Sequence, residues 1–409
     1  MIYRSTRNNN VEVTSAEAIA QGISVDGGLF IPDEIPAITL DEIKKLSTMK
    51  YNERAAYIFA KYLTDFTDEE IRYCTDNAYT DKKFSTENIS EISHLFDGTY
   101  MLELWHGPTC AFKDMALQIL PYLLTTSAKK INCDKKIVIL VATSGDTGKA
   151  ALEGFKDVPG TQIMVFYPEQ GVSPMQKRQM TTQEGDNVAV CAIKGNFDDA
   201  QNGVKAIFTN DEIKKILDDN GMMFSSANSI NWGRLAPQII YYVSAYATLV
   251  ADEEIALGDK INVVVPTGNF GNILAAYFAK KMGVPETIAE VENIEYIKLA
   301  EGMGVDAVIN KKLSTAGRIF RFTLSNKVRS IKCLNGSDAE VLEFIVNPDS
   351  SITKGPIEDL HFPKEAIIGG IIRGNESFIA NEHTIIKPYD RVVVFALPQV
   401  LSKVNNFFI

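Results

Sequence analysis

The sequence lacks any run of 18 uncharged apolar residues, which is about the length that a membrane-spanning helix needs. Its longest mostly apolar stretch, residues 236–251, is interrupted by polar residues such as Gln238 and is predicted to form a buried helix. Met1 is followed by the polar residues 3–8, which do not form the apolar segment of a signal peptide. We therefore expect a protein of the cytoplasm that does not span a membrane.

Cysteine is scarce, and its positions form neither a metal-binding nor a disulfide pattern. The five cysteines are Cys74, Cys110, Cys133, Cys191 and Cys333. They are odd in number, widely spaced and never arranged as C-x-x-C, which argues against a disulfide framework and a zinc knuckle. A reducing compartment and the absence of a metal site are the resulting expectations.

The sequence also has fewer positively than negatively charged residues. Lys and Arg total 41 against 52 Asp and Glu, so the formal net charge is 41 − 52 = −11. No segment carries the run of basic residues that a nucleic-acid backbone requires, so nucleic acid is not expected as a partner. An anionic small substrate would need a locally cationic pocket. The 45% hydrophobic and 23% charged fractions are those of an ordinary globular protein.

The length of 409 residues predicts two or three domains. Residues 15–74 are mostly helical in pattern, and residues 14–17 resemble a helix start. Beyond residue 100, short β-branched runs alternate with helical stretches. The predicted strands are 136–142, 162–167, 188–193 and 261–265. Strands separated by helices indicate an α/β fold with a mostly parallel sheet.

The pattern changes from about Ala339. Short strands joined by turns are followed by a closing helix that begins at Pro398. The predicted strands are 340–346, 366–373, 376–380 and 391–396. This part of the chain is predicted to be a small, separate α+β module.

The most informative segment for chemistry is residues 106–116. A Gly-Pro turn places Lys113, which has apolar neighbours, at the start of a helix. A lysine in such a position is easily desolvated, which lowers its pKa and favours a neutral amine that forms Schiff bases. The alternative interpretation is a surface lysine in a salt bridge with Asp114.

Two strand-to-helix loops are candidate anion sites. Residues 143–151 place hydroxyls, glycines and free backbone N–H groups at a helix N-terminus, which favours a carboxylate or a phosphate. The alternative is a plain loop in which Ser144 or Thr147 caps the helix. Residues 265–272 match neither a P-loop nor G-x-G-x-x-G, but their glycine-rich turn is typical of a site for one phosphate.

A fourth segment, residues 228–234, contains Asn231 and Arg234, whose side chains are suited to clamping an oxyanion. The alternative is a capped helix start with Arg234 in a structural ion pair. Considered together, one lysine and an anion cradle in the same fold are what a cofactor with both an aldehyde and a phosphate requires.

Residues 1 to about 285 resemble threonine synthase, a fold-type II pyridoxal-phosphate (PLP) enzyme. Eight motifs in family order carry the resemblance: Ser5-Thr6-Arg7, Asp26-Gly27-Gly28-Leu29, His106 to Asp114, Thr143 to Gly148, Gln179 to Thr182, Gly195 to Ala200, Ser229 to Arg234 and Gly268 to Asn272. The resemblance implies parallel sheets with helices. It also implies conversion of O-phosphohomoserine and water to threonine and phosphate, by γ-elimination and water addition at the β-carbon.

The same resemblance implies roles for individual residues. Lys113 would hold PLP as a Schiff base and then act as acid and base. The cofactor phosphate would be bound by Gly268, Asn269, Phe270, Gly271 and Asn272. The substrate carboxylate would be held by Ser144, Gly145, Asp146, Thr147 and Gly148, and the substrate phosphate would lie near Asn231 and Arg234.

The threonine synthase pattern ends near Pro285. Residues 287–309 look like the end of the nucleotide-binding domain of a Trk-type potassium-uptake regulator, TrkA, and residues from about 329 onward are similar to its C-terminal ligand-binding domain. The segments that carry this second resemblance are Ala339 to Phe344, Ile371 to Gly374 and Lys387 to Phe395. The expected domains are a mostly helical part over 1–100, a PLP-binding α/β core over 101–285, the end of a nucleotide-binding-like segment over 286–328, and a TrkA C-terminal-like domain over 329–409.

The chain is therefore interpreted as a hybrid, whether a natural fusion, an engineered chimera or an assembly error. Its fold-type II large domain is expected to be truncated, because the threonine synthase pattern ends near Pro285. The resemblance implies a Ser or Thr partner for the pyridine nitrogen in the C-terminal part, and none is identified after residue 285. The regulator half lacks its G-x-G-x-x-G strand and helix. Two hypotheses follow, a PLP-dependent lyase of the threonine synthase type and a non-catalytic ligand-sensing regulator.

The two halves of the chain also suggest which partners to expect. Partial domains joined end to end leave apolar edges that favour self-association, although the oligomeric state stays open. The regulator resemblance implies a membrane transporter as a partner of the C-terminal domain.

Overall fold

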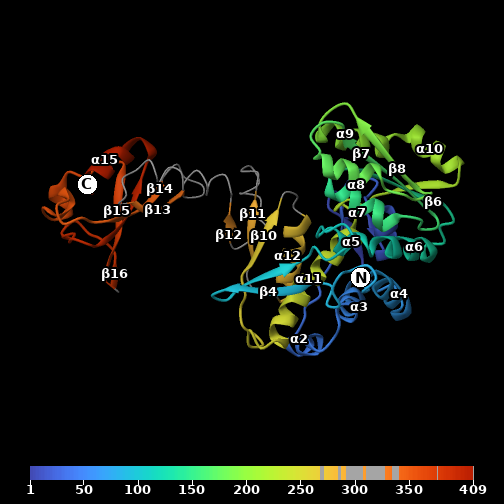
Figure 1. Cartoon of the computed structure of the whole chain (residues 1–409), viewed down its shortest axis with the longest axis horizontal. Coiled ribbons are helices and arrows are strands. Elements are labelled where there is room, and N and C mark those ends of the chain that lie inside the picture. Colours follow the sequence, from blue (N-terminus) through green and yellow to red (C-terminus); the bar gives the residue numbers. More distant parts are fainter. Residues whose placement is uncertain are drawn as a thin grey trace. The chain divides into compact units, whose positions relative to one another are not determined.

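The computed structural model (Figure 1) describes residues 1–267, 271–283, 287–291, 307–309, 328–333, 340–374 and 376–408. The described residues up to Ile288 form one compact unit, and those from Ala289 onward form a second. Along the described ranges, no helix is long and apolar enough to cross a membrane.

Four helices and a small antiparallel sheet form the N-terminal part. The strands, in the order β2-β1-β3, are β1 (Tyr3–Ser5), β2 (Glu12–Val13) and β3 (Phe30–Pro32). The helices are α1 (Ser15–Gln21), α2 (Leu40–Ser47), α3 (Tyr51–Tyr62) and α4 (Asp68–Ala78). The predicted helix start at residues 14–17 is confirmed as a capping box, in which Thr14 and Glu17 satisfy each other's backbone N–H groups. The strands β1–β3 were not predicted, because segments this short carry little sequence pattern.

Glu42 on α2 is the acceptor in a second capping box and also in an ion pair. One carboxylate oxygen accepts hydrogen bonds from Lys61 and Tyr57, each 2.6 Å long, and the other accepts the N–H of Thr39 at 2.7 Å. Although burial raises it, these hydrogen bonds together lower the pKa of Glu42 to about 2. A carboxyl whose pKa is lowered on folding stabilises the protein above its unfolded pKa and loses that contribution as the pH falls through its folded pKa.

We therefore expect Glu42→Gln to lower the free energy of unfolding at neutral pH by about 3 kcal/mol, the value that corresponds to this pKa shift. The difference from the unaltered chain should shrink as the pH falls from about 4.5 to about 2. Urea unfolding over this pH range measures it. Glu17→Gln is the matched control, because it changes the same kind of capping contact and breaks no ion pair among the described residues. A difference that does not depend on pH would contradict the assignment.

A four-stranded parallel sheet lies in the first unit. Its strands, in the order β8-β7-β6-β9, are β6 (Lys136–Ala142), β7 (Thr161–Pro168), β8 (Val188–Ile193) and β9 (Met222–Ser225). The predictions at 136–142 and 188–193 are confirmed to the residue, and 162–167 lies within β7. Strand β9 was not predicted, because Met-Met-Phe-Ser contains no β-branched residue.

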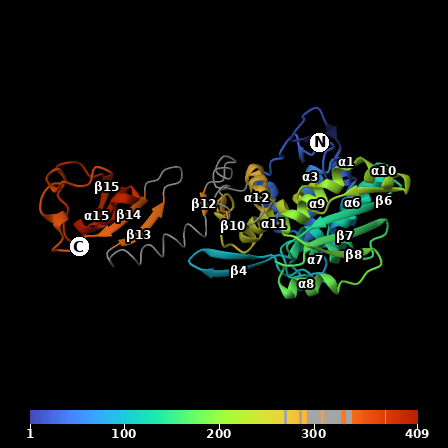
Figure 2. The ribbon, with the colours of Figure 1, turned by 90° about the horizontal axis from the view of Figure 1, so that it is seen from above.

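Helices cover both faces of this sheet, as Figure 2 shows for α7 (Asp146–Phe155) and α9 (Phe197–Thr209) on either side of β7. Helix α9 packs against Leu140 and Ala142 of β6. Helix α7 packs against the other face, where a Cβ on Gly148 would lie only 2.9 Å from a methyl of Val165. Side chains alternate between the faces of a strand, so Val165, which is paired with Val141, faces away from α9.

Helix α11 (Trp232–Ala251) confirms the buried helix predicted over 236–251. Its first residue, Trp232, is 1% exposed. The indole ring contacts Tyr3 and Tyr62 at centroid distances of 5.3 Å and Phe278 at 5.5 Å. These aromatic contacts join the start of α11 to β1, α3 and α12 (Gly271–Met282).

Nine further helices and strands precede β13 along the described ranges. They are β4 (Glu91–Phe96), β5 (Thr99–Glu103), α5 (Asp114–Leu117), α6 (Leu120–Lys130), α8 (Pro174–Thr181), α10 (Asp211–Asp219), β10 (Val263–Thr267), β11 (Thr287–Val291) and β12 (Ala307–Ile309). The strand predicted at 261–265 overlaps β10.

The second unit contains a five-stranded antiparallel sheet with the order β13-β14-β17-β15-β16. Its elements are β13 (Val328–Cys333), β14 (Glu340–Ile345), β15 (Ala366–Arg373), β16 (Glu376–Phe378), β17 (Arg391–Ala396) and α15 (Leu401–Phe407), with 3-10 turns at Ser351–Thr353, Ile357–Leu360 and Pro398–Val400. Phe344 stacks on Phe408 at 4.0 Å. The predicted α+β module, with its short strands and closing helix, is confirmed.

Candidate active site

Lys113 lies at the N-cap position of α5, at the end of a loop that begins at Gly107. The next residue, Asp114, is fully buried and turns back into this loop, where it accepts hydrogen bonds from the N–H and the hydroxyl of Thr109 at 2.8 and 2.7 Å. A Cβ on Gly107 would lie 2.4 Å from the Cβ of Asp114, so this close packing requires glycine. Asp114 therefore fixes the loop that presents the lysine.

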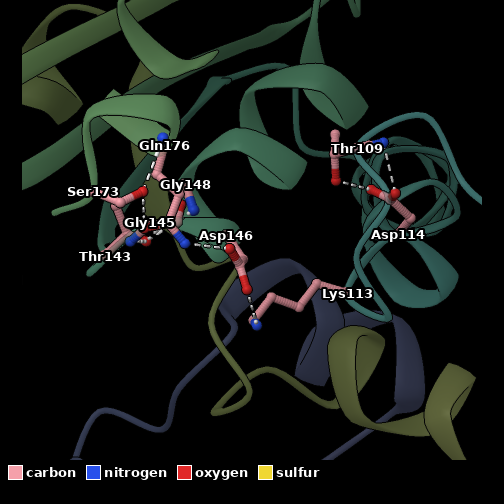
Figure 3. Close-up of polar contacts among 9 residues, drawn as sticks. All are labelled: Thr109, Lys113, Asp114, Thr143, Gly145, Asp146, Gly148, Ser173 and Gln176. Carbon is pink, nitrogen blue, oxygen red and sulfur yellow. Dashed lines mark hydrogen bonds and ion pairs between the residues drawn. The ribbon is translucent and has the colours of Figure 1, made fainter. Parts of the chain in front are cut away.

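The side chain of Lys113 points away from Asp114 toward Asp146, as Figure 3 shows. Its Nζ lies 3.3 Å from Oδ2 of Asp146, and the lysine side chain is 19% exposed. Burial lowers the pKa of Lys113, the carboxylate of Asp146 opposes that effect, and the charge of Arg234 adds to it. The alternative of a surface lysine in a salt bridge with Asp114 is therefore not what the structure shows.

The loop before α7 is organised by the hydroxyl of Thr143. This oxygen accepts the N–H groups of Gly145 at 3.0 Å and Gly148 at 2.9 Å. The N-cap residue of α7 is Gly145, so neither Ser144 nor Thr147 caps the helix as the alternative interpretation required. Thr143 thus occupies the N–H groups of Gly145 and Gly148, and those of Asp146 and Thr147 at the N-terminus of α7 are left able to bind an anion.

A residue that the sequence did not single out, Gln176 of α8, closes this loop. Its Nε2 donates to Oδ1 of Asp146 at 2.6 Å, and a Cβ on Gly145, whose φ is 150°, would lie 2.5 Å from its side-chain carbon. Ser173 caps α8 by accepting the N–H of Gln176 at 3.2 Å. The Ser-Pro pair at 173–174 is typical of a helix start, but only the fold brings this helix to Asp146.

Asn231 and Arg234 lie at the start of α11. The amide of Asn231 donates to the carbonyls of Ile19 at 3.0 Å and Ser226 at 2.9 Å, and its oxygen accepts the N–H of Gly233 at 2.8 Å. Each polar atom of this side chain thus has a partner within the protein. Asn231 fixes the start of α11 and connects it to α1.

Arg234 is a buried cation with few partners. It is 3% exposed; Nη1 donates to the carbonyl of Ala227 at 3.0 Å, and Nε has no hydrogen-bond partner. Burial lowers the pKa of Arg234 to about 10. A buried polar atom without a partner is costly, and a bound anion would satisfy it.

The glycine-rich segment, residues 265–272, lies next to the segment of residues 228–234 at its C-terminal end. Gly268, Asn269 and Phe270 lie outside the described residues, whereas Gly271 and Asn272 open α12. A Cβ on Gly271 would lie 2.8 Å from the hydroxyl of Ser229, so the third and fourth motifs are packed together. Within the described ranges, no group of three or more His, Cys, Asp and Glu side chains is placed to bind a metal ion.

A desolvated lysine, the N-terminus of α7 and a buried arginine whose Nε has no partner fit a cofactor that carries an aldehyde and a phosphate. These features define a PLP-dependent enzyme of fold type II. A family model described as pyridoxal-phosphate dependent enzyme matches residues 91–340, and one described as threonine synthase N terminus matches residues 2–79. The TrkA-C domain matches residues 341–409.

Individual proteins that are similar to this chain in sequence or structure come from the same family. The threonine synthase of Saccharomyces cerevisiae is 31% identical over an alignment of 445 positions. The match covers 99% of this chain and 84% of that protein. The threonine synthase-like 1 protein of Homo sapiens is 40% identical over 279 residues, 66% of this chain and 37% of that protein. A PLP-bound threonine synthase structure from Brucella melitensis has a TM-score of 0.64 at 32% identity, and the match covers 83% of this chain and 66% of that chain.

The chain belongs to the threonine synthase family of PLP-dependent enzymes, and it also carries a TrkA-C domain. The resemblances to threonine synthase and to the TrkA C-terminal domain are thus confirmed, including the hybrid character of the chain. Residues 287–309, which resemble the end of a nucleotide-binding domain, lie within the PLP-family match, so that resemblance stays a prediction. The chain nevertheless spans little more than a third of the length of the threonine synthase-like 1 proteins that it matches. The enzyme-family match continues to residue 340, past Pro285. The boundaries expected at 100, 285 and 328 stay predictions.

Proposed function

We propose that this chain acts in the cytoplasm as a PLP-dependent threonine synthase that converts O-phosphohomoserine and water to threonine and phosphate. The contact between Lys113 and Asp146, 3.3 Å long, carries the proposal. It joins the segment that would hold the cofactor to the segment that would hold the substrate carboxylate. Family membership supports the same reaction.

PLP fits the residues present. Lys113 would bind its aldehyde carbon, since a desolvated lysine of lowered pKa is a ready nucleophile. The cofactor phosphate would be bound by Gly268, Asn269, Phe270, Gly271 and Asn272. When bound, PLP acts as an electron sink for negative charge that develops at the α-carbon of the substrate.

The remaining steps depend on the side chains and backbone of this chain. The N–H groups at the start of α7, within residues 144–148, bind the substrate carboxylate. Arg234 donates to the substrate phosphate, and Asn231 positions Arg234 by fixing the start of α11. The amine of Lys113 takes up and returns protons, because a lowered pKa allows it to do both near neutral pH.

For the second unit we propose a ligand-binding regulatory role, supported by the TrkA-C match, with a membrane transporter as a partner. Exposed apolar side chains on its sheet suit self-association: Ile367 is 67% exposed and Phe395 is 37% exposed.

The test is to purify the full chain with PLP and to assay threonine and phosphate release from O-phosphohomoserine. Borohydride reduction followed by peptide mass spectrometry then locates the lysine that carries the cofactor. Modification of Lys113 with equal release of threonine and phosphate supports the proposal. No PLP uptake by folded protein overturns it; stabilisation by other small ligands without PLP would then favour the sensing function.

A further inference from the structure

The carboxylate of Asp146, the first residue of α7, lies between Gln176 and Lys113, as Figure 3 shows. Its Oδ1 accepts a hydrogen bond from Nε2 of Gln176 at 2.6 Å, and its Oδ2 lies 3.3 Å from Nζ of Lys113. The two oxygens thus serve different partners. The proposed function uses the backbone N–H of Asp146 but gives no task to its side chain or to Gln176.

Three contacts fix the orientation of the Gln176 side chain. A carboxylate only accepts hydrogen bonds, so the amide atom that faces Asp146 is the nitrogen. The amide oxygen accepts the hydroxyl of Ser173 at 3.1 Å. The side chain also lies against Gly145, where a Cβ would be 2.5 Å from the amide carbon. Gln176 is therefore held in place by groups other than Lys113, and it presents its N–H to Asp146 from a fixed position.

Asp146 needs this second partner because its side chain is 47% exposed. An ion pair that is open to water gives little net stability, since it is screened and both side chains lose rotamer freedom. A carboxylate at the start of a helix is also attracted to the free N–H groups of that helix. The hydrogen bond from Gln176 goes to a charged acceptor, which makes it one of the stronger kind. It keeps Oδ2 of Asp146 directed at the amine.

The charged groups around Lys113 act in opposite directions. Burial lowers the pKa of Lys113, and the carboxylate of Asp146 is the largest opposing influence. Arg234 lowers it further and Asp114 raises it, both to a smaller extent. Nζ also lies 4.6 Å from the centroid of the Phe112 ring, an arrangement that favours the charged amine. Asp114 turns back into its own loop, so Asp146 is the carboxylate that contacts the amine.

We propose that Gln176 is a positioning residue for Lys113, because it holds the carboxylate of Asp146 beside the amine and away from the N–H groups of α7. Held there, the carboxylate favours a proton on Nζ, which Lys113 requires when it returns a proton to the substrate. The same hydrogen bond leaves the start of α7 free for the substrate carboxylate. Gln176 itself contacts neither cofactor nor substrate. The inference rests on the proposed function, since it takes Lys113 as the residue that moves protons.

Competitive labelling of the cofactor-free full chain with trace acetic anhydride tests this role. Only the neutral amine reacts, so acetylation of Lys113 against pH, read by peptide mass spectrometry, has its midpoint at the pKa of this lysine. Asp146→Asn removes the charge that opposes burial and should lower the midpoint by about one pH unit. Gln176→Met, of similar length but without a donor, lets the carboxylate turn away and should lower the midpoint by about half a pH unit.

The double variant separates positioning from a merely structural role. If Gln176 acts through Asp146, adding Gln176→Met to Asp146→Asn should produce no further shift, because no charge is left to position. Gln179→Met is the matched control, since it removes the same amide from the same helix, and among the described residues Gln179 makes no hydrogen bond to Asp146. It should leave the midpoint unchanged. Lys130, with a side chain 20% exposed and paired with Glu70, provides a reference curve in every sample.

The outcomes distinguish this inference from the proposed function. An unchanged or raised midpoint in Gln176→Met, or a shift of the same size in the Asp146→Asn background, overturns the role of Gln176, while uptake of PLP at Lys113 still supports the enzyme assignment. If borohydride reduction traps no PLP on Lys113, the proposed function fails. The role of Gln176 in proton transfer then fails with it, whatever the labelling curves show.

Discussion

Lys113→Ala is expected to abolish covalent uptake of PLP and to lower threonine formation by at least about a thousandfold, within the range that a lost proton-transfer group accounts for. In the proposed function one amine holds the cofactor and moves the protons. Residues 106–116 contain no other lysine, so no neighbouring residue of the loop can supply the amine. Visible absorbance after PLP addition and a phosphate-release assay measure the two effects.

Lys130→Ala is the control for this prediction. Lys130 is also largely buried, with a side chain 20% exposed and an ion pair to Glu70 at 2.8 Å, but it lies on α6 and serves the packing of α4. It should leave PLP uptake intact once any loss of stability is corrected for. Retention of the visible absorbance band in Lys113→Ala would show that the cofactor lysine lies elsewhere.

Arg234→Met is expected to change stability and function in opposite directions. Arg234 is buried, and no carboxylate lies within hydrogen-bond distance of it in the described part of the chain; its Nε has no partner. Replacing such a buried charge by an apolar side chain of similar length should stabilise the cofactor-free protein by about 1–3 kcal/mol. The loss of an anion-binding cation should at the same time lower kcat/KM by about a hundredfold.

Arg54→Met supplies the contrasting case. Arg54 is 9% exposed but well partnered: its guanidinium donates to the carbonyl of Leu46 at 2.8 Å, the hydroxyl of Ser244 at 2.9 Å and the hydroxyl of Thr248 at 2.6 Å. Its replacement should destabilise the fold by about 2–4 kcal/mol, because it leaves several buried acceptors unsatisfied. Denaturant unfolding compares the two variants. If Arg234→Met destabilises as Arg54→Met does, Arg234 is a structural residue rather than an anion site.

The sequence predicted the parallel sheet well because its strands are buried, and buried strands are recognisable as β-branched runs between helices. Strands β6 and β8 were predicted to the residue for this reason. The hairpin of β4 and β5 was not predicted, since none of its residues is buried and their exposure follows no simple alternation.

The sequence named candidate site residues, but it did not predict which of them contact one another. Lys113 and the loop before α7 are separated by two helices and a strand in the sequence, so the ion pair with Asp146 and the contact with Gln176 follow only from the packed fold. Asn231 illustrates the limit of motif-based reasoning. An asparagine beside an arginine is suited to binding an anion, but its use as the cap of α11 becomes visible only when its three partners are located.

The aromatic cluster at the start of α11 gives the protein an intrinsic optical reporter. The chain has two tryptophans, of which Trp232 is 1% exposed and Trp105 is 46% exposed. A buried indole emits at shorter wavelength than a hydrated one, so a single excitation distinguishes the two. Trp105 precedes the loop that presents Lys113, and Trp232 is two residues from the buried Arg234. Fluorescence can therefore follow cofactor arrival at the loop and loosening of the helix separately, in the unlabelled protein.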